Sequence, residues 1–129
     1  MMTKEKQNSD LVNSLITIAE SSSKTSVVPI SKTGKKTVAT TLFDVLEENP
    51  YQFKQFDLFY EVHINQLNKS KTLKLETYKL QRSELCALLG WGIHGDSHGK
   101  LALIPAEGEK YKELLSNPTI KKKKAYNKN

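Results

Sequence analysis

The sequence predicts a single α+β domain in which helices pack on one face of a largely antiparallel sheet. The chain has 129 residues, a length typical of one domain. Apolar residues recur at helical spacing in some segments and alternate with polar residues in others, which indicates both helices and strands. We expect the domain to span residues 10–126, with a flexible N-terminus at residues 1–9 and a flexible basic C-terminus at residues 127–129.

The first third of the chain is predicted to hold two helices joined by a loop. Asp10 precedes apolar residues at helical spacing, so a first helix is expected to begin with Asp10 as its N-cap; Ile18 leaves a short strand open as the alternative. Residues 23–36 lack periodicity and contain proline and glycine, which indicates an extended loop with room for a short strand at Val27 and Val28. Thr37 is expected to cap a second helix that ends before Pro50.

The middle of the chain is predicted to contain a strand over residues 56–66, because apolar and polar residues alternate there. This pattern places His63 on the solvent-exposed face beside Glu61, where its imidazole is expected to be solvated. The polar stretch up to residue 81 is predicted to be a loop with a short strand.

Clear turn signals organise the C-terminal part. Ser83 is expected to cap a brief helix that stops at Gly90. A hairpin is predicted next, with strand residues 91–94 and 101–104 on either side of a glycine-bracketed turn. A helix over residues 108–116 and a final strand over residues 119–126 are expected to complete the domain. The lysines of that last strand suit the edge of a sheet, because like charges oppose pairing with a second molecule.

Composition places the chain among soluble proteins of a reducing compartment. No stretch approaches the roughly 20 apolar residues of a membrane-spanning helix, and the first residues lack the apolar run of a secretory signal. The single cysteine, Cys86, lies in apolar sequence and is expected to be buried rather than a nucleophile. We therefore expect a cytoplasmic protein with no membrane partner. No cofactor is expected either, because phosphate-cradling glycine loops and dinucleotide fingerprints are absent from the sequence.

The positive charge of the chain is concentrated near its C-terminus. The formal net charge is +6, and residues 119–129 contain five lysines and no acidic residue. Weak, nonspecific nucleic-acid binding is one function that this pattern allows, with Lys121, Lys122, Lys123 and Lys124 on phosphates and Tyr126 stacking on a base. Lysine favours loose backbone attraction, because it lacks the bidentate fork with which arginine recognises guanine.

The stretch GWGIHGDSHGK, residues 90–100, holds the candidate functional hairpin residues Trp91, His94, Asp96 and Lys100. His94, Asp96 and His98 are of the ligand types that zinc accepts, but they straddle a turn and a fourth ligand is missing. A small enzyme would use His94 as general base, oriented by Asp96 or Glu61, yet no nucleophile motif accompanies it. We favour a tight turn whose polar residues satisfy backbone groups, and we predict no metal.

An aromatic surface is the remaining candidate for function. Trp91, Tyr51, Phe53 and Phe56 would form an exposed patch beside the hairpin, whereas the favoured interpretation places Trp91 in the core next to Leu103. We conclude that the chain is a binding or accessory module without catalytic activity. Its partner, a protein or weakly bound nucleic acid, stays unassigned.

Several segments together resemble a known family. They are KKTVA (35–39), ENPY (48–51), RSELCALLGWGIH (82–94), GKLAL (99–103) and NPTIKKKKA (117–125). The chain resembles, from about Leu15 to Ala125, a family of small bacterial proteins of unknown function with a GWGIHxD…GK hairpin motif. His94, Asp96, Gly99 and Lys100 match that motif, whereas the position of His98 is not usually histidine, which weakens the metal hypothesis. The resemblance implies a compact cytoplasmic bacterial domain and no reaction.

Overall fold

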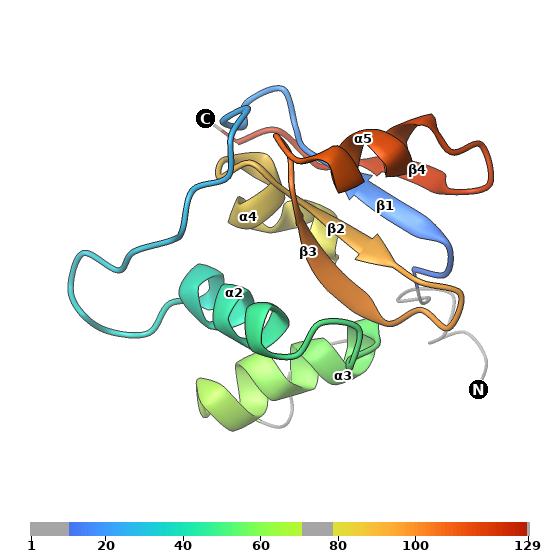
Figure 1. The fold of residues 1–129 in the computed structure, drawn as a ribbon. Coiled ribbons are helices and arrows are strands. Elements are labelled where there is room, and N and C mark those ends of the chain that lie inside the picture. Colours follow the sequence, from blue (N-terminus) through green and yellow to red (C-terminus); the bar gives the residue numbers. More distant parts are fainter. Residues whose placement is uncertain (1–10, 71–78, 129) are drawn as a thin grey trace.

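The fold is built on a four-stranded sheet, seen in a computed structural model that describes residues 11–70 and 79–128 (Figure 1). Its strands are β1 (Ser14–Thr17), β2 (Trp91–Gly95), β3 (Leu101–Pro105) and β4 (Lys121–Lys124). The order across the sheet is β3-β2-β1-β4, and only the β1–β4 pair is parallel. The predicted α+β domain with a largely antiparallel sheet is therefore confirmed.

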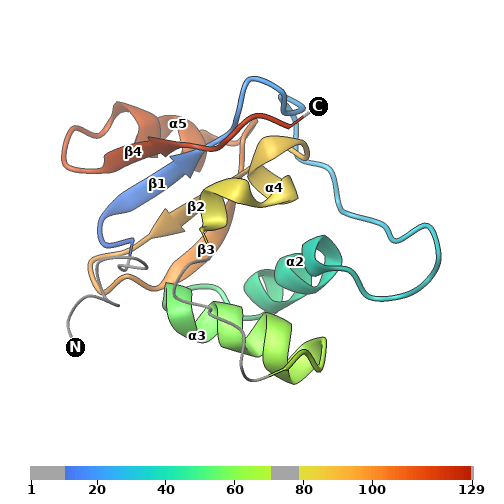
Figure 2. The same ribbon diagram turned by 180° about the vertical axis from the view of Figure 1, so that it is seen from behind.

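Helices cover both faces of the sheet. The helical elements are α2 (Val38–Glu48), α3 (Gln55–Phe59), the π-helix η1 (Tyr60–Gln66), the 3-10 turn η3 (Leu80–Arg82), α4 (Glu84–Ala87) and α5 (Glu109–Ser116). Seen from in front and from behind, α4 and α5 lie on opposite sides of the sheet (Figures 1 and 2). The expectation that helices cover one face holds for α2, α3 and α4, and α5 covers part of the other face.

The core divides between these two faces. Ile16, Ile93 and Leu101 belong to a large cluster with residues of α2, α3, η1 and α4. Leu15 and Ile104 point the opposite way and pack with Tyr111 and Leu114 of α5. We call this second side the α5 face. His94 lies on it, because it pairs with Leu15 on one neighbouring strand and paired residues share a face.

The predicted first helix is wrong where the structure describes it, because residues 14–17 form β1; Asp10 lies outside the described residues. Leu15 and Ile16 are adjacent and are 0% and 1% exposed. Both are buried because β1 is an inner strand with helices on both sides. A strand of this kind has a continuous apolar run, which periodicity cannot distinguish from part of a buried helix.

The predicted strand over residues 56–66 is also wrong, because these residues lie in α3 and η1. Leu58 and Val62 are one helical turn apart and both are fully buried, which satisfies an amphipathic helix. His63 is 5% exposed rather than solvated. Burial lowers its pKa, and the charge of Lys69 lowers it further. The loop and short strand expected up to residue 81 fall mostly outside the described residues, and residues 80–82 form η3.

Elements with strong local signals are confirmed. The hydroxyl of Thr37 accepts from the backbone N–H of Thr40, and the Thr40 side chain accepts from the N–H of Thr37, so a complete capping box begins α2. The hairpin of β2 and β3, the last helix and the strand β4 at the sheet edge also form as predicted. Gly90 ends the α4 segment with a positive φ of 76°, a conformation that glycine adopts at little cost.

The chain ends were predicted to be flexible. Residues 1–9 lie outside the described residues. At the other end, the side chain of Asn127 accepts from the backbone N–H of Ser21, and the backbone N–H of Lys128 donates to the Ser21 hydroxyl; the flexibility of residues 127–129 stays a prediction. Among the helices that the structure describes, none is long and apolar enough to cross a membrane.

Candidate functional site

Asp96 organises the turn between β2 and β3. Its Oδ1 accepts from the backbone N–H groups of His98 and Lys100, both at 2.9 Å. Its own backbone N–H donates to the carbonyl of Lys100 at 3.0 Å. Partial burial acts to raise the pKa of Asp96, but the N–H donors of Lys100 and His98 outweigh it and the pKa is lowered. Asp96 thus satisfies backbone groups of a tight turn, as the favoured interpretation required.

His94 is joined to Tyr51 on the α5 face of the sheet. Tyr51 Oη lies 2.9 Å from His94 Nδ1, and the two rings meet edge to face with centroids 5.6 Å apart. Burial lowers the pKa of His94, the charge of Lys110 lowers it further, and Asp96 acts in the opposite sense. Burial raises the pKa of Tyr51, and Asp96 adds to this effect. These shifts favour the neutral forms of both groups, and the imidazole tautomer sets which of the two groups donates in their hydrogen bond.

The backbone brings Tyr51 to His94 around the edge of the sheet. The N–H of Tyr51 donates to the carbonyl of Leu101 at 2.8 Å, and the N–H of Leu101 donates to the carbonyl of Phe53 at 2.9 Å. Tyr51 has a φ of 59°, a left-handed conformation that costs a non-glycine residue roughly 1–3 kcal/mol. Tyr51 was predicted as part of an aromatic patch and not as the partner of His94. Its position directly after the Asn49-Pro50 helix stop was the available signal.

Neither Glu61 nor Cys86, which the enzyme hypothesis considered, is hydrogen-bonded to His94. The carboxylate of Glu61 accepts from the side chains of Asn65 and Gln66 within η1. Cys86 is fully buried and burial raises its pKa. Within residues 11–70 and 79–128, no three His, Cys, Asp or Glu side chains gather at a spacing that suits a metal ion. His94 and Asp96 each affect the pKa of the other, but the two side chains are hydrogen-bonded to different groups.

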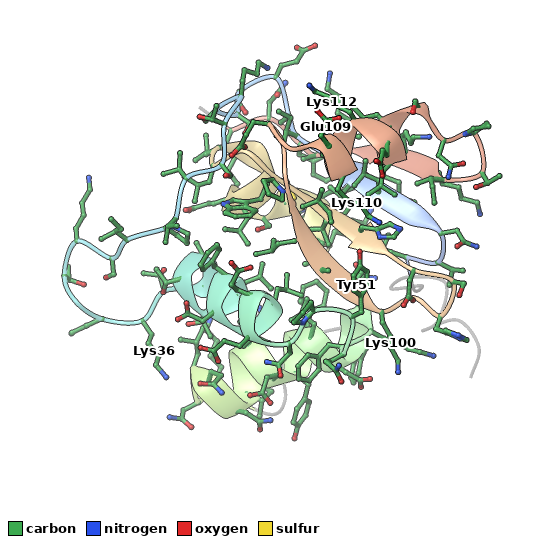
Figure 3. The ribbon with its side chains drawn as sticks, in the orientation of Figure 1. Lys36, Tyr51, Lys100, Glu109, Lys110 and Lys112 are labelled. Carbon is green, nitrogen blue, oxygen red and sulfur yellow. The ribbon has the colours of Figure 1, made fainter. Side chains whose placement is uncertain are left out.

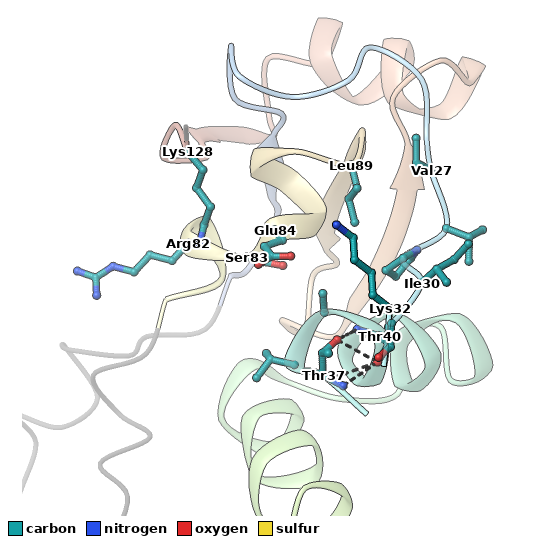
Figure 4. A pocket seen from close by; sticks show the side chains of 15 residues that line it. Val27, Ile30, Lys32, Thr37, Thr40, Arg82, Ser83, Glu84, Leu89 and Lys128 are labelled. Atoms are coloured by element: carbon teal, nitrogen blue, oxygen red, sulfur yellow. Dashed lines mark hydrogen bonds between the residues drawn. The ribbon is translucent and has the colours of Figure 1, made fainter. Parts of the chain in front are cut away.

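A cleft lies on another part of the molecule, between the extended segment of residues 27–32 and the beginnings of α2 and α4 (Figure 4). Its volume is about 740 Å³. Its apolar walls comprise Val27, Val28, Pro29, Ile30, Val38 and Leu89. Val28 is 56% exposed and Ile30 is 84% exposed. The cleft therefore presents aliphatic surface that the fold itself leaves in water.

Trp91 anchors one end of this segment. Its indole N–H donates to the carbonyl of Val27 at 2.9 Å, and its ring packs edge to face on Phe43. The N–H of Val27 donates to Leu89, and Ser26 donates from both its backbone and its hydroxyl to the Glu107 carboxylate. Trp91 is 7% exposed, so the favoured core position is confirmed and the exposed aromatic patch with Tyr51, Phe53 and Phe56 is wrong.

Charged groups flank the apolar walls of the cleft. Lys32, Arg82 and Lys128 line it together with one carboxylate, that of Glu84. Figure 4 shows the Lys32 side chain extended across the cavity, whereas the Arg82 guanidinium points away from it. Without the Arg82 guanidinium, Lys32 and Lys128 against Glu84 leave one positive charge at the cleft. A second, smaller cavity of about 320 Å³ meets the first at Val38, Arg82 and Ser83.

The four lysines of β4 do not form one surface. Their register with β1 alternates, so Lys122 and Lys124 share the α5 face with Leu15 while Lys121 and Lys123 point to the other side. The ammonium group of Lys122 donates to carbonyls of the connection between α5 and β4, and Lys124 forms an ion pair with Glu20. The Arg82 guanidinium lies 6.0 Å from the ring centroid of Tyr126. Nucleic-acid binding by this segment stays a prediction, with its cations divided between two faces.

Comparison with known proteins supplies a family and no activity. No curated protein and no solved structure matches the chain. A sequence model of the Family of unknown function (DUF6157) matches residues 6–129, which include the capped helix α2, the His94 hairpin and β4. The resemblance to a family of unknown function is thereby confirmed, and the chain belongs to DUF6157.

Proposed function

We propose that this protein is a non-catalytic binding module whose cleft takes a small amphipathic carboxylate, with the apolar part against the 27–32 segment and the carboxylate near Lys32. The observation that carries the proposal is the aliphatic wall of the cleft, where Ile30 is 84% exposed beside uncompensated positive charge. The volume of about 740 Å³ falls within the roughly 300–1,000 Å³ of small-molecule sites. A reducing compartment such as the cytoplasm is proposed as well, which the single buried Cys86 supports.

Burial of the aliphatic wall would supply most of the binding free energy. Fully burying an exposed isoleucine or valine side chain contributes about 1.5–3 kcal/mol. Val28 and Ile30 are adjacent to the cavity and largely exposed, so an alkyl chain in the cleft would cover surface on both. Burial of this aliphatic surface must also offset the translational and rotational freedom that the ligand loses on binding. A ligand that contacts the whole aliphatic wall is therefore favoured.

The charges would select the head group. Lys32 and Lys128 outnumber Glu84 at the cleft, so an anionic head is favoured over a neutral or cationic one. At a surface with high effective dielectric this preference is worth about 1 kcal/mol, or roughly a fivefold change in affinity. The apolar contact therefore sets affinity, and the charge sets the choice between ligands of equal length.

Residues 28–36 would supply the adaptable wall. This segment is held at Val27 by the Trp91 indole and at Thr37 by the capping box of α2. Between these anchors, the side-chain bonds of Ser31 and Thr33 stay within the segment, and the Lys36 ammonium donates to Oε1 of Gln66 at 3.3 Å. Movement of such a segment against a ligand breaks few interactions.

The test is titration with dodecanoate, and dodecanol as the uncharged ligand of the same length, followed by calorimetry and by the fluorescence of Trp91. Dodecanoate is expected to bind saturably at one site, more tightly than dodecanol, and to change the emission of Trp91. Ile30→Ser should weaken binding about tenfold. Leu115→Ser removes an aliphatic side chain on α5 that is 43% exposed and serves as the matched control.

Two results would contradict the proposal. One is the absence of saturable dodecanoate binding below its aggregation limit. The other is an equal loss in Ile30→Ser and Leu115→Ser, which would show that the alkyl chain adheres to exposed aliphatic surface in general.

A further inference from the structure

β4 forms one edge of the sheet and directs part of its backbone outward. It is the last strand in the order β3-β2-β1-β4, and among the described strands it pairs with β1 alone (Figures 1 and 2). On its inner side, the N–H of Lys121 donates to the carbonyl of Asn13, and the N–H of Ala125, the residue after β4, donates to the carbonyl of Thr17. Successive residues of a strand direct their backbone groups to opposite sides, so those of Lys122 point away from β1.

Gln81 of η3 covers the C-terminal half of this outer edge. Its side-chain amide donates to the carbonyl of Lys124 at 2.8 Å, and its own carbonyl accepts from the N–H of Tyr126 at 2.9 Å. Lys122 lies before this contact. Neither its backbone N–H nor its carbonyl has a hydrogen-bond partner among residues 11–70 and 79–128. An outward donor and acceptor on one residue are what a further strand would pair with.

The lysine side chains of β4 divide by face, and one face leaves its charges unpaired. Lys122 and Lys124, on the α5 face, place their ammonium groups on acceptors within the chain. Lys121 and Lys123 lie on the opposite face, which Ile16 shares. Within the described residues, neither of these two ammonium groups has a hydrogen-bond or ion-pair partner. Two free positive charges therefore flank the unpaired backbone groups of Lys122.

We propose that the outer edge of β4 binds an extended acidic segment of a partner protein, which adds antiparallel to the sheet as a further strand. The residue opposite Lys122 exchanges both backbone hydrogen bonds with it, and its two neighbours lie directly opposite Lys121 and Lys123. Residues that are directly opposite share a face, so carboxylates at these two positions meet the free ammonium groups. The recognised segment therefore has an acidic residue on each side of one central residue.

The same features disfavour two other occupants of this edge. A second copy of the chain, paired through its own β4, would bring lysines directly opposite lysines, which is destabilising. A nucleic acid is bound best by cations that gather on one surface, whereas those of β4 are split between two faces. It also lacks the regularly spaced N–H and C=O groups that would match the backbone of Lys122.

The test titrates the full-length protein with the capped peptide Thr-Val-Glu-Thr-Glu-Val-Thr while the backbone amide of Lys122 is followed by NMR. A saturable downfield shift of this amide proton is expected, because it gains a hydrogen bond. Replacing both glutamates by glutamine should weaken binding about tenfold, through the loss of two exposed ion pairs. N-methylation of the central threonine should abolish binding. N-methylation of the second glutamate, whose N–H points away from β4, should not.

Protein variants separate backbone pairing from charge. Lys122→Pro removes the outward N–H, a change that an edge strand tolerates, and should abolish binding. Lys122→Val keeps this N–H and should bind the peptide. Lys121→Gln combined with Lys123→Gln should weaken binding about tenfold. The control combines Lys100→Gln, after the hairpin turn, with Lys110→Gln, in the first turn of α5 (Figure 3); it removes the same charge and should change affinity less than twofold.

Several outcomes would overturn the proposal. Absence of a saturable peptide shift, or equal binding by the two N-methylated peptides, would show that no strand pairs with this edge. Saturation of the Lys122 shift by a single-stranded thymidine oligonucleotide, and not by the peptide, would assign the edge to a nucleic acid. A shift that depends on protein concentration alone would assign it to a second copy. None of these measurements involves the cleft, so failure here is distinguishable from failure of the proposed carboxylate site.

Discussion

The β2–β3 hairpin and the segment of residues 28–36 differ in how far their apolar side chains are buried. In the hairpin, Trp91, Ile93 and Leu101 are buried, and Oδ1 of the turn residue Asp96 accepts from two backbone N–H groups of the turn. In the segment, Val28 and Ile30 face water, and the bonds that Ser31 and Thr33 form are local. The apolar side chains of the hairpin pack in the core, whereas those of the segment stay exposed to solvent. Contiguous exposed aliphatic surface of this kind is typical of binding sites.

The largest expected effect lies in the hairpin, at Gly95. A β-carbon at this position would lie 1.7 Å from the carbonyl oxygen of Leu11, and the obstacle is backbone that cannot rotate away. We expect Gly95→Ala to lower the free energy of unfolding by at least about 3 kcal/mol, the upper range for overpacking. Chemical denaturation followed by circular dichroism measures this.

The matched control lies in the exposed segment. Gly34 has nothing within 4 Å of its hypothetical β-carbon, and its φ is 79°. Gly34→Ala should cost only the left-handed backbone, about 1–2 kcal/mol. If both variants lose the same stability, the contrast in packing between the two regions does not exist.

The second effect concerns Trp91, which joins the two regions. Trp91→Phe removes the N–H that donates to the Val27 carbonyl and part of the ring that packs on Phe43. We expect a loss of about 2 kcal/mol, from one hydrogen bond and a small cavity. Amide exchange at residues 26–28 should also become faster. An unchanged exchange rate there would mean that the indole does not hold the segment.

The pH dependence of stability provides a third, smaller effect. The folded-state pKa values of His94 and His63 are both lowered by burial. As the pH falls below about 6.5, the unpaired histidine value, the unfolded chain takes up protons before the folded one does. The free energy of unfolding should therefore decline with falling pH and level off below the folded-state pKa values.

This prediction separates the histidines from the carboxylates. The pKa values of Asp96, Glu61 and Glu107 are lowered in the folded protein, so these carboxylates stabilise the fold, and this contribution is lost only below about pH 4.5. Denaturation midpoints measured between pH 7.5 and 5 isolate the histidine contribution, and His94→Gln should reduce the slope. A flat profile over that interval would show that the two imidazoles are not buried in their neutral forms.

Local signals explain how much of the fold could be predicted from the sequence. Thr37, Gly90 and Asp96 each act within a few residues of chain. The capped helix α2, the turn after α4 and the β2–β3 hairpin were therefore predictable. The segments at 14–17 and 55–66 were assigned wrongly, because burial on two faces or in a short helix leaves no clear period. Only the tertiary structure decides those cases.

The candidate sites show the same limit more strongly. His94 and Asp96 were identified from their motif, but the partner of His94 is Tyr51, 43 residues away in the chain. The cleft was not predictable either, because the sequence shows Val28 and Ile30 in a loop but does not show what they face.

The smallest expected change in stability comes from Ile30→Ser. This variant gives the most direct test of the difference between the segment of residues 28–36 and the hairpin. Because Ile30 is 84% exposed, its loss should change the free energy of unfolding by less than about 0.5 kcal/mol, as for other surface positions. Ile104→Ser on β3, where the side chain is 5% exposed, should by contrast cost several kcal/mol, since it leaves a cavity and a buried hydroxyl. Dodecanoate binding should respond in the opposite order, with affinity lost in Ile30→Ser at full stability. A destabilised Ile30→Ser would mean that this side chain serves the fold, and the exposed aliphatic wall would then need no ligand to explain it.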